Sequence, residues 1–327
     1  MTGNLGYVGS HLTELLLLSG HEVIGCDLSL FPSAVCGRLA TPTKQLLKDF
    51  RDINSGELEG IDAVAHLAGI SNDPMGELNP GLTMKINGEG SVTLGEKARA
   101  AGVRIFAFAS SCSIYGSSGD QPRIETDQTN PLSEYAASKL FAEKGLSALK
   151  SDNFNVFILR NATAYGASSV FRTDLVVNDL SAGMCASGMA EIRSDGSPWR
   201  PLIHCRDMAR AFQMFIEKNP SSVSGSPINV GFQHENFQVK DIGIQIQRAW
   251  PGGKVTYLPN SASDPRDYKV NFSFLKSIFP GFHPRHPLGI GVPELRVYLL
   301  SIGYTKAQRD AKRYVRITEL HKRIHTL

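Results

Sequence analysis

The chain has 327 residues, of which 42% are hydrophobic and 20% charged, and its formal net charge is +3 at pH 7. This length is enough to bury one large core or two adjacent ones, and the composition is ordinary for a globular protein. The net charge is too small to indicate binding to nucleic acid or to a membrane surface.

Five scattered cysteines without a CxxC pair argue against a disulfide framework or a zinc site and favour a reducing compartment. No apolar run approaches the roughly 18 residues that a membrane span needs, and no signal-peptide pattern opens the chain. We therefore expect a cytoplasmic protein that binds neither metal, nor membrane, nor nucleic acid.

The chain begins with MTGNLGYVGSHL, in which Gly3, Gly6 and Gly9 lie three residues apart before an apolar stretch. This spacing allows a tight turn, brings backbone N–H groups close to a pyrophosphate and starts a helix whose dipole favours anions. A loop of this kind follows a buried strand, yet only Met1 and Thr2 precede it. A start assigned too late, a truncated sequence and a different segment filling the gap would each account for this. We favour the late start and expect the first strand to lie upstream of residue 1.

The first half of the chain alternates short apolar runs with helical patterns. Four runs predict strands that are buried on both faces, and two longer stretches predict helices between them. The strands are expected at 21–27, 61–69, 103–111 and 154–160, and the helices at 90–102 and 133–149. This alternation indicates βαβ units and an α/β fold with a doubly wound parallel sheet of the Rossmann type.

After residue 161 the pattern becomes looser. The stretch 201–218 predicts a strand end leading into a helix, and 227–231 predicts one more strand. We predict a dinucleotide-binding domain over 1–161, to which 201–231 returns. A smaller, C-terminal substrate-binding domain would comprise 162–200 and 232–327. Within it, the basic stretch 304–327 predicts a solvated helix with one face packed on the body.

An acidic residue ends the strand expected at 21–27. Asp27 follows Gly9 by 18 residues, where a carboxylate can accept hydrogen bonds from the adenosine ribose of a dinucleotide. The same carboxylate would repel a 2′-phosphate, so this arrangement favours NAD over NADP. Asp27 on its own would fit a turn or a helix cap equally well.

The stretch YAASK places Tyr135 and Lys139 four residues apart on one face of the helix expected at 133–149. A tyrosine with a pKa of about 10 is a poor base near neutrality. A cation about 4 Å away, at an effective dielectric near 20, contributes about 4 kcal/mol, or roughly three pKa units. Lys139 and a positively charged nicotinamide together would therefore make Tyr135 a working base.

Four residues at the end of the strand expected at 103–111 are further candidates: Ser110, Ser111, Cys112 and Ser113. The carboxyl edge of a parallel sheet is where ligands bind, and a serine hydroxyl there can share the substrate's proton with Tyr135. YxxxK alone is common by chance. The glycine loop, the strand-end aspartate, these serines and YxxxK in this order indicate a dinucleotide-dependent enzyme.

The chain as a whole resembles the extended short-chain dehydrogenase/reductases that act on nucleoside-diphosphate sugars, the group of UDP-galactose 4-epimerase and dTDP-glucose 4,6-dehydratase. The matching segments are TGNLGYVGSHL, DFRD (49–52), HLAG, KINGEGS, SSCSIYG, WRPLIHCRDMARA and, more loosely, DPRDYKV. The resemblance implies NAD as cofactor and a nucleoside-diphosphate sugar as substrate. It also implies a homodimer in which the helices at 90–102 and 133–149 pair into a four-helix bundle.

Carried over residue by residue, the resemblance implies three groups of site residues. The catalytic group is Ser111, Tyr135 and Lys139. The cofactor-binding group is Gly3, Leu5, Gly6, Tyr7, Val8, Gly9, Asp27, Asp49, Phe50, Leu67, Ala68, Gly69, Asn87, Ser110, Tyr135 and Lys139. The substrate-binding group is Ser71, Ser111, Cys112, Ser113, Asn161, Thr163, Arg200 and Arg266, with the two arginines on the diphosphate.

The reaction that the family shares begins with hydride transfer from sugar C4 to NAD+, while the tyrosine takes the hydroxyl proton. Dehydratases of the family carry acidic residues directly after the catalytic Ser or Thr, but Cys112 and Ser113 stand there. Neither is a competent acid for expelling water. We therefore expect an epimerase that works through a 4-keto intermediate and regenerates NAD+, and we rank dehydration low.

Two other functions stay open. A nucleotide-sugar dehydrogenase or ketoreductase would use the same Ser111, Tyr135 and Lys139 but would exchange its cofactor. An NAD-binding scaffold or sensor would be expected to lose the tyrosine or the lysine, and this chain keeps both.

Overall fold

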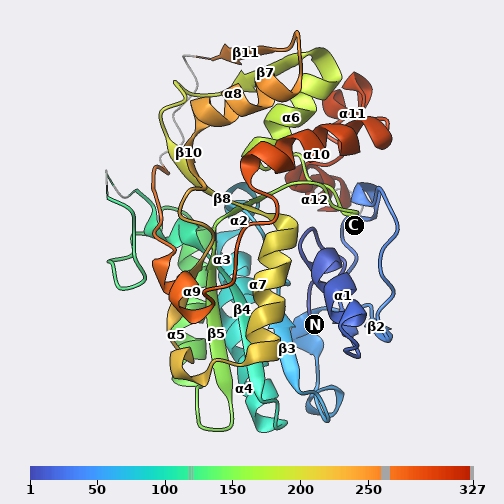
Figure 1. The fold of residues 1–327 in the computed structure, drawn as a ribbon. Coiled ribbons are helices and arrows are strands. Elements are labelled where there is room, and N and C mark those ends of the chain that lie inside the picture. The colour runs from blue at the N-terminus through green and yellow to red at the C-terminus, as the bar shows by residue number, and fades with distance from the viewer. Residues whose placement is uncertain (118, 120, 259–265, 325–327) are drawn as a thin grey trace.

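A computed structural model describes residues 1–327 except 118, 120, 259–265 and 325–327. Its centre is a parallel sheet (Figure 1), in which four strands pair in the order β3-β4-β5-β9. Their bounds are Ala63–His66, Ile105–Ser111, Asn155–Asn161 and Pro227–Val230. Each lies within or close to a strand predicted from the apolar runs, and the predicted α/β fold with a Rossmann-type parallel sheet is confirmed.

Two further strands extend the sheet beyond β3. The strand β1 (Ile24–Cys26) pairs in parallel with β2 (Lys44–Leu46). Thr2 lies between β1 and β3 and forms parallel bridges to Cys26 and to His66. The backbone of Met1 and Thr2 therefore occupies the central position of the sheet. The strand expected upstream of residue 1 lies outside this chain and stays a prediction.

Helices cover both faces of the sheet. On one face α1 (Gly9–Leu18) packs against α7 (Cys205–Lys218), and on the other lie α4 (Gly90–Ala100) and α5 (Glu134–Ala148). The alternation of side chains along β4 explains this arrangement. Ala107 belongs to the apolar core beneath α1 and α7, whereas Phe106 and Phe108 belong to the core beneath α4 and α5.

A separate apolar core lies above the carboxyl ends of the central strands (Figure 1). Its helices are α6 (Val176–Ser187), α8 (Val239–Ala249), α10 (Leu288–Ser301) and α11 (Lys306–Asp310). Its strands are β6 (Thr163–Tyr165), β8 (Trp199–His204) and β10 (Asn236–Gln238) in one sheet, with β7 (Met189–Ile192) and β11 (Lys254–Tyr257) in another. The strand end predicted at 201–218 is β8, which joins this upper layer, while α7 and β9 pack on the central sheet. The domain boundaries stay a prediction.

Short elements connect these layers. The remaining helical segments are η1 (Pro32–Ala34), η2 (Phe50–Asp52), η3 (Ser55–Glu57), α2 (Asp73–Gly76), α3 (Pro80–Thr83), η4 (Met84–Glu89), η5 (Cys112–Tyr115), η6 (Ser221–Val223), α9 (Ser273–Ile278) and α12 (Arg316–Ile324). No helix in the described ranges has the length and apolarity to cross a bilayer.

The basic C-terminal stretch differs from the single solvated helix that its pattern predicts. It forms two helices, α11 and α12, because Lys312 adopts a φ of 50° just after α11 and turns the chain. Tyr314 and Arg316 are buried. The charge pattern could not reveal this, since the surface that buries them comes from distant segments.

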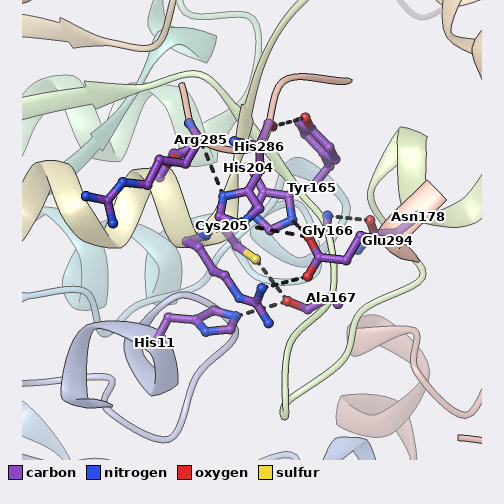
Figure 2. A network of polar contacts seen from close by, with 12 residues as sticks. His11, Tyr165, Gly166, Ala167, Asn178, His204, Cys205, Arg285, His286 and Glu294 are labelled. Atoms are coloured by element: carbon purple, nitrogen blue, oxygen red, sulfur yellow. Dashed lines mark hydrogen bonds and ion pairs between the residues drawn. The ribbon is translucent and has the colours of Figure 1, made fainter. Parts of the chain in front are cut away.

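A buried polar network joins the lower and upper layers behind the cleft (Figure 2). His11, on α1, contacts the backbone oxygen of Ala167 through Nε2 at 3.0 Å, and Cys205 donates its thiol to the same oxygen at 3.2 Å. The His204 ring stacks on that of His286, with centroids 4.5 Å apart. These contacts fix the helix that follows the glycine loop against the layer above it.

Candidate active site

A cleft of about 1640 Å³ runs along the carboxyl ends of β1, β3, β4 and β5, beneath the upper layer. A pocket for one small molecule usually measures about 300–1000 Å³. The cleft therefore has room for two ligands end to end. Every residue of the three predicted groups lines it except Asn87 and Cys112.

The glycine loop forms one wall of the cleft, and its glycines are required by contacts within the loop. Gly3 has a φ of 74°, and a Cβ there would lie 2.6 Å from the backbone nitrogen of Ala68. A Cβ on Gly9 would lie 1.9 Å from the carbonyl oxygen of Gly3. The helix α1 then starts without a side-chain cap, which leaves first-turn N–H groups to bind an anion.

The acidic residue predicted at the ribose position lies beside this loop. Asp27 accepts hydrogen bonds from the backbone N–H of Leu5 at 3.2 Å and of Ser29 at 2.8 Å. Partial burial raises its pKa, while those two hydrogen bonds and the charge of Arg316 act in the opposite direction. Asp49 and Phe50 line the same end of the cleft, and Asp49 binds the Arg51 side chain.

The stretch Leu67–Gly69 follows β3 along the floor of the cleft. Asn87 was predicted to contact the cofactor, but it is fully buried and lies outside the lining of the cleft. Its side chain accepts from the Ile70 N–H at 2.8 Å and donates to the Ile70 oxygen at 2.9 Å. Because the oxygen and the nitrogen of its side-chain amide both bind the Ile70 backbone, Asn87 fixes the conformation of this stretch from the side away from the cleft.

The three predicted catalytic residues come together where β4 meets α5. Ser111 ends β4, and its hydroxyl acts to lower the pKa of Tyr135. Tyr135 and Lys139 are one turn apart on α5, and the Lys139 ammonium lies 5.9 Å from the centre of the Tyr135 ring. All three line the cleft.

The electrostatics of this group differ from the sequence-based expectation. Burial raises the pKa of Tyr135 to about 12, and the negative charge of Asp73 acts in the same direction. The Ser111 hydroxyl and the charge of Arg172 lower it. Burial lowers the pKa of Lys139 to about 8, against the effect of Glu143. Lys139 alone therefore does not make Tyr135 a base, and a further positive charge from a ligand is needed.

Behind these residues a buried ion pair anchors α5 to the sheet. Arg160 on β5 binds Glu143 on α5 at 2.8 Å, with both side chains almost fully buried. Ser110 donates its hydroxyl to Glu143, so this predicted cofactor contact is engaged with α5. Arg160 also donates to the hydroxyl of Tyr115 at 2.9 Å. The network sets the position of α5 relative to the strand ends.

The residues after Ser111 divide between core and cleft. The Ser111 hydroxyl accepts from the Ser113 N–H at 3.1 Å and so starts the turn η5. This turn directs Cys112 into the core, where its thiol donates to the Arg160 oxygen at 3.1 Å and burial raises its pKa. The predicted substrate contact through Cys112 is therefore wrong. Ser113 faces the cleft.

Two buried polar atoms near the catalytic group have no hydrogen-bond partner among the described residues: the Ser113 hydroxyl and Oδ1 of Asn161. Both residues line the cleft, and Asn161 pairs in register with Ser111. Buried polar atoms are nearly always satisfied. These two are therefore suited to hydroxyl groups of a bound ligand.

The two arginines predicted to bind a diphosphate have different surroundings. Arg200 is buried on β8, and its Nη1 donates to the backbone oxygens of Trp199 at 2.7 Å and Arg266 at 2.5 Å. Arg266 pairs with Asp73. Ser71 accepts from Arg172 Nη1 at 3.1 Å, and Thr163 lines the cleft at the start of β6.

Several charged residues that line the cleft escaped the sequence analysis, and those that bear on the site are Asp73, Arg172, Asp174 and Arg316. Arg172 and Asp174 form a buried ion pair at 2.8 Å, and Asn72 donates to Asp174 at 2.8 Å. The stretch GISNDP (69–74) was the one available signal for Asp73. Nothing in the sequence around the other three marks them.

The cleft fits a dinucleotide on the chemistry of its own wall. The glycine loop leaves no space for a Cβ at Gly3 or Gly9, so only backbone N–H groups face a pyrophosphate there. Asp27 stands beside that loop as a hydrogen-bond acceptor for a ribose. Among the described residues no group of three His, Cys, Asp or Glu side chains is placed to hold a metal ion.

Comparison with known proteins agrees with this geometry. The family model "NAD dependent epimerase/dehydratase family" matches residues 1–231. UDP-glucuronic acid decarboxylase 1 of Xenopus tropicalis is 26% identical over 303 residues, which is 89% of this chain and 69% of that protein. UDP-glucose 4-epimerase of Neisseria meningitidis serogroup C is 29% identical over 259 residues. The match covers 71% of this chain and 76% of that protein.

Solved structures share the fold. UDP-glucuronic acid 4-epimerase from Bacillus cereus, solved with UDP-glucuronic acid and NAD, superposes with a TM-score of 0.81 at 23% sequence identity. The match covers 92% of this chain and 98% of that one.

Proposed function

Because the chain belongs to the NAD-dependent epimerase/dehydratase family, we propose that it epimerises a nucleoside-diphosphate sugar through a 4-keto intermediate. The observation that supports this most directly is the catalytic group at the end of β4. Ser111, Tyr135 and Lys139 line the cleft together, with Lys139 one turn from Tyr135 on α5. The neutral residues Cys112, which is buried in the core, and Ser113 follow Ser111, where a dehydratase of the family has acids.

The roles of these residues follow from their positions. NAD+, when bound, accepts a hydride from the sugar. Tyr135 takes the proton of the sugar hydroxyl, and Ser111, whose hydroxyl acts on Tyr135, shares that proton. Lys139 contributes positive charge beside the ring. On return the same hydroxyl groups give the proton back, so no further acid is needed.

The sugar would be oriented by the unpartnered polar atoms next to this group. The Ser113 hydroxyl and Asn161 Oδ1 offer a donor and an acceptor for sugar hydroxyls. Arg200 and Arg266, together with Thr163 and Ser71, line the adjoining part of the cleft, where we propose that the diphosphate and sugar bind. Cys112 is too deeply buried to take part.

The test begins with the purified protein and its cofactor. We would determine whether NAD+ co-purifies and follow NADH absorbance while adding UDP-, dTDP-, GDP- and CDP-sugars, with products separated by chromatography. An epimeric product without net NADH supports the proposal. Stoichiometric NADH or a need for added cofactor would identify a dehydrogenase or ketoreductase. Release of CO2 from UDP-glucuronic acid would identify a decarboxylase, and loss of water a dehydratase.

The role of Tyr135 is tested by Tyr135→Phe. Removal of the hydroxyl should lower kcat by about 10²–10⁴-fold, the usual contribution of a general acid or base, with NAD+ content unchanged. Tyr257→Phe, which removes the hydroxyl of a 45% exposed tyrosine on β11 that does not line the cleft, is the matched control. Full activity of Tyr135→Phe would exclude Tyr135 as the base.

Assembly and location are part of the same proposal. We propose a homodimer in which α4 and α5 of two copies pair, and Phe141, which is 47% exposed on α5, supports this. We also propose a cytoplasmic location, and the division into domains at 1–161 with 201–231, and at 162–200 with 232–327. Light scattering of the Phe141→Glu variant, which should shift to monomer, tests the dimer.

A further inference from the structure

Arg316, the first residue of α12, is a buried cation on the wall of the cleft. Its side chain is only 4% exposed, yet it lines the cleft from the C-terminal end of the chain. Its Nη1 has no hydrogen-bond partner, and no described residue forms an ion pair with its guanidinium. A buried charge of this kind destabilises the fold unless an anion pairs with it.

The nearby carboxylates are already engaged. Asp27 accepts from the backbone N–H groups of Leu5 and Ser29. Asp174 accepts from Arg172 and from Asn72. Both carboxylates act on Arg316 only through space, and the positive charge of Arg172 opposes them. Burial, followed by Arg172, lowers the pKa of Arg316 to about 9. The guanidinium therefore lacks a partner of its own.

The ring of Phe31 leaves the hydrogen-bonding edge of the guanidinium available. The Arg316 guanidinium carbon lies 4.0 Å from the centre of that ring. A cation over an aromatic face is held by the ring's quadrupole, while all five N–H donors of a guanidinium lie in its own plane. Phe31 therefore supports the group without using its donors.

The charged neighbours of Arg316 place it at the glycine loop. Asp27 lies beside Leu5, to which it is hydrogen-bonded, and the charge of Arg172 acts on Tyr7. Asp27 and Arg172 are thus close to loop residues 5–7, and Arg316, on the wall of the same cleft, feels the charge of both. A dinucleotide bound by this loop carries its pyrophosphate here.

The backbone around Arg316 is tied to segments on two sides of the cleft. The Tyr314 oxygen accepts from the Thr173 N–H at 3.0 Å, and Arg313 donates to the Ser33 oxygen at 3.2 Å. Farther along, α12 contacts α2. This bracing fixes the position from which the Arg316 side chain reaches the cleft.

We propose that Arg316 binds the pyrophosphate of NAD, so that α12 acts as the second half of the pyrophosphate site whose first half is the glycine loop. The loop supplies neutral N–H donors, and Arg316 supplies a compensating positive charge that no side chain already pairs with among the described residues. The C-terminal helix would thereby retain the cofactor. This inference depends on NAD as the cofactor and not on the proposed epimerisation.

The experiment measures binding to the full chain freed of carried cofactor, by isothermal titration with NAD+, NADP+, ADP-ribose, ADP and adenosine. Arg316→Met should weaken NAD+, ADP-ribose and ADP by roughly 10- to 100-fold, as expected for charge-assisted hydrogen bonds, and adenosine by less than about twofold. The affinity of Arg316→Lys for these three ligands should lie between that of wild type and that of Arg316→Met. Lys306→Met, an exposed cation nearby that does not line the cleft, is the matched control and should change nothing.

Three results would overturn the proposal. An equal loss for adenosine would show that Arg316 shapes the pocket without binding phosphate. A loss confined to NADP+ would move the contact to a ribose 2′-phosphate. Unchanged affinity for every ligand would remove Arg316 from the site. Urea unfolding without ligand distinguishes a loss of binding from a loss of stability. The free energy of unfolding of Arg316→Met should be no lower than that of wild type, because the substitution removes a buried unpaired charge.

Discussion

The two ends of the cleft are lined by different chemical groups. The end at the glycine loop is lined by backbone, and its shape depends on the missing side chains of Gly3 and Gly9. The end beneath the upper layer is lined by long charged side chains engaged with other segments, such as Arg266, which pairs with Asp73, and Arg200, which donates to the Arg266 backbone oxygen. The first end suits a constant ligand, and the second can be altered one side chain at a time.

This difference bears on what a short stretch of sequence can reveal. The glycine loop and the Tyr135–Lys139 pair each lie within one short stretch of chain. The charged side chains of the other end come from distant segments, and it is there that we propose the sugar binds. Substitutions at the two ends should therefore fail in different ways.

The largest effect is expected at the backbone-lined end. Gly9→Ala places a Cβ 1.9 Å from the Gly3 oxygen, so the loop must open. We expect NAD+ affinity to fall by about 100-fold or more, since overpacking of a tight contact forces the backbone to shift. Isothermal titration measures this. Gly289→Ala, at a glycine with open space around it, is the control, and equal NAD+ affinity in both variants would refute the prediction.

A smaller effect, on stability, is expected at the buried Arg172–Asp174 ion pair of the cleft wall. Asp174→Ala leaves Arg172 buried without its partner, which should lower the free energy of unfolding by about 3–5 kcal/mol. NAD+ affinity should change less than tenfold. The control is Asp62→Ala, whose pair with Arg104 is exposed on both sides and should cost at most about 1 kcal/mol. Urea unfolding measures the free energy of unfolding of both variants. Equal losses in the two would contradict the expected difference between a buried and an exposed ion pair.

The smallest effect concerns pH and the buried histidines. Burial lowers the pKa of His11 to about 4, of His66 to about 3 and of His204 to about 2. The unfolded chain takes up these protons below pH 6.5 and the folded chain does not, so stability is lost as the pH falls from about 7. Each histidine should lower the free energy of unfolding by about 2 kcal/mol between pH 7 and pH 5.

The variant that isolates this effect is His11→Asn, which can still donate to the Ala167 oxygen (Figure 2). The loss of unfolding free energy between pH 7 and pH 5 should shrink by about 2 kcal/mol in it. His234→Asn, at an exposed histidine, should leave the pH dependence unchanged. An unaltered pH dependence in His11→Asn would show that this side chain protonates freely in the folded protein.

The strands and the catalytic helix were predictable because their signals are local. Apolar runs locate β3, β4, β5 and β9 within a few residues, and the i, i+4 spacing places Tyr135 and Lys139 on one face. The edge strand β2 escaped because its residues, Lys44–Leu46, are polar or half-exposed and show no apolar run.

The charged end was not predictable, because its contacts join distant parts of the chain. Asn72 and Asp174 are 102 residues apart, and Asp73 and Arg266 are 193 apart. Cys112 shows a further limit. It follows Ser111 directly, yet the hydrogen bond that starts η5 directs its side chain into the core. The positions of residues along the sequence do not reveal the direction in which such a turn points a side chain.

The catalytic helix has one more consequence. Tyr135, Lys139 and Glu143 recur every four residues and so share one side of α5, with the last locked to Arg160 in the sheet. Base, cation and anchor therefore form one rigid unit. A substitution on the opposite wall of the cleft can therefore change what binds there without moving Tyr135 or Lys139.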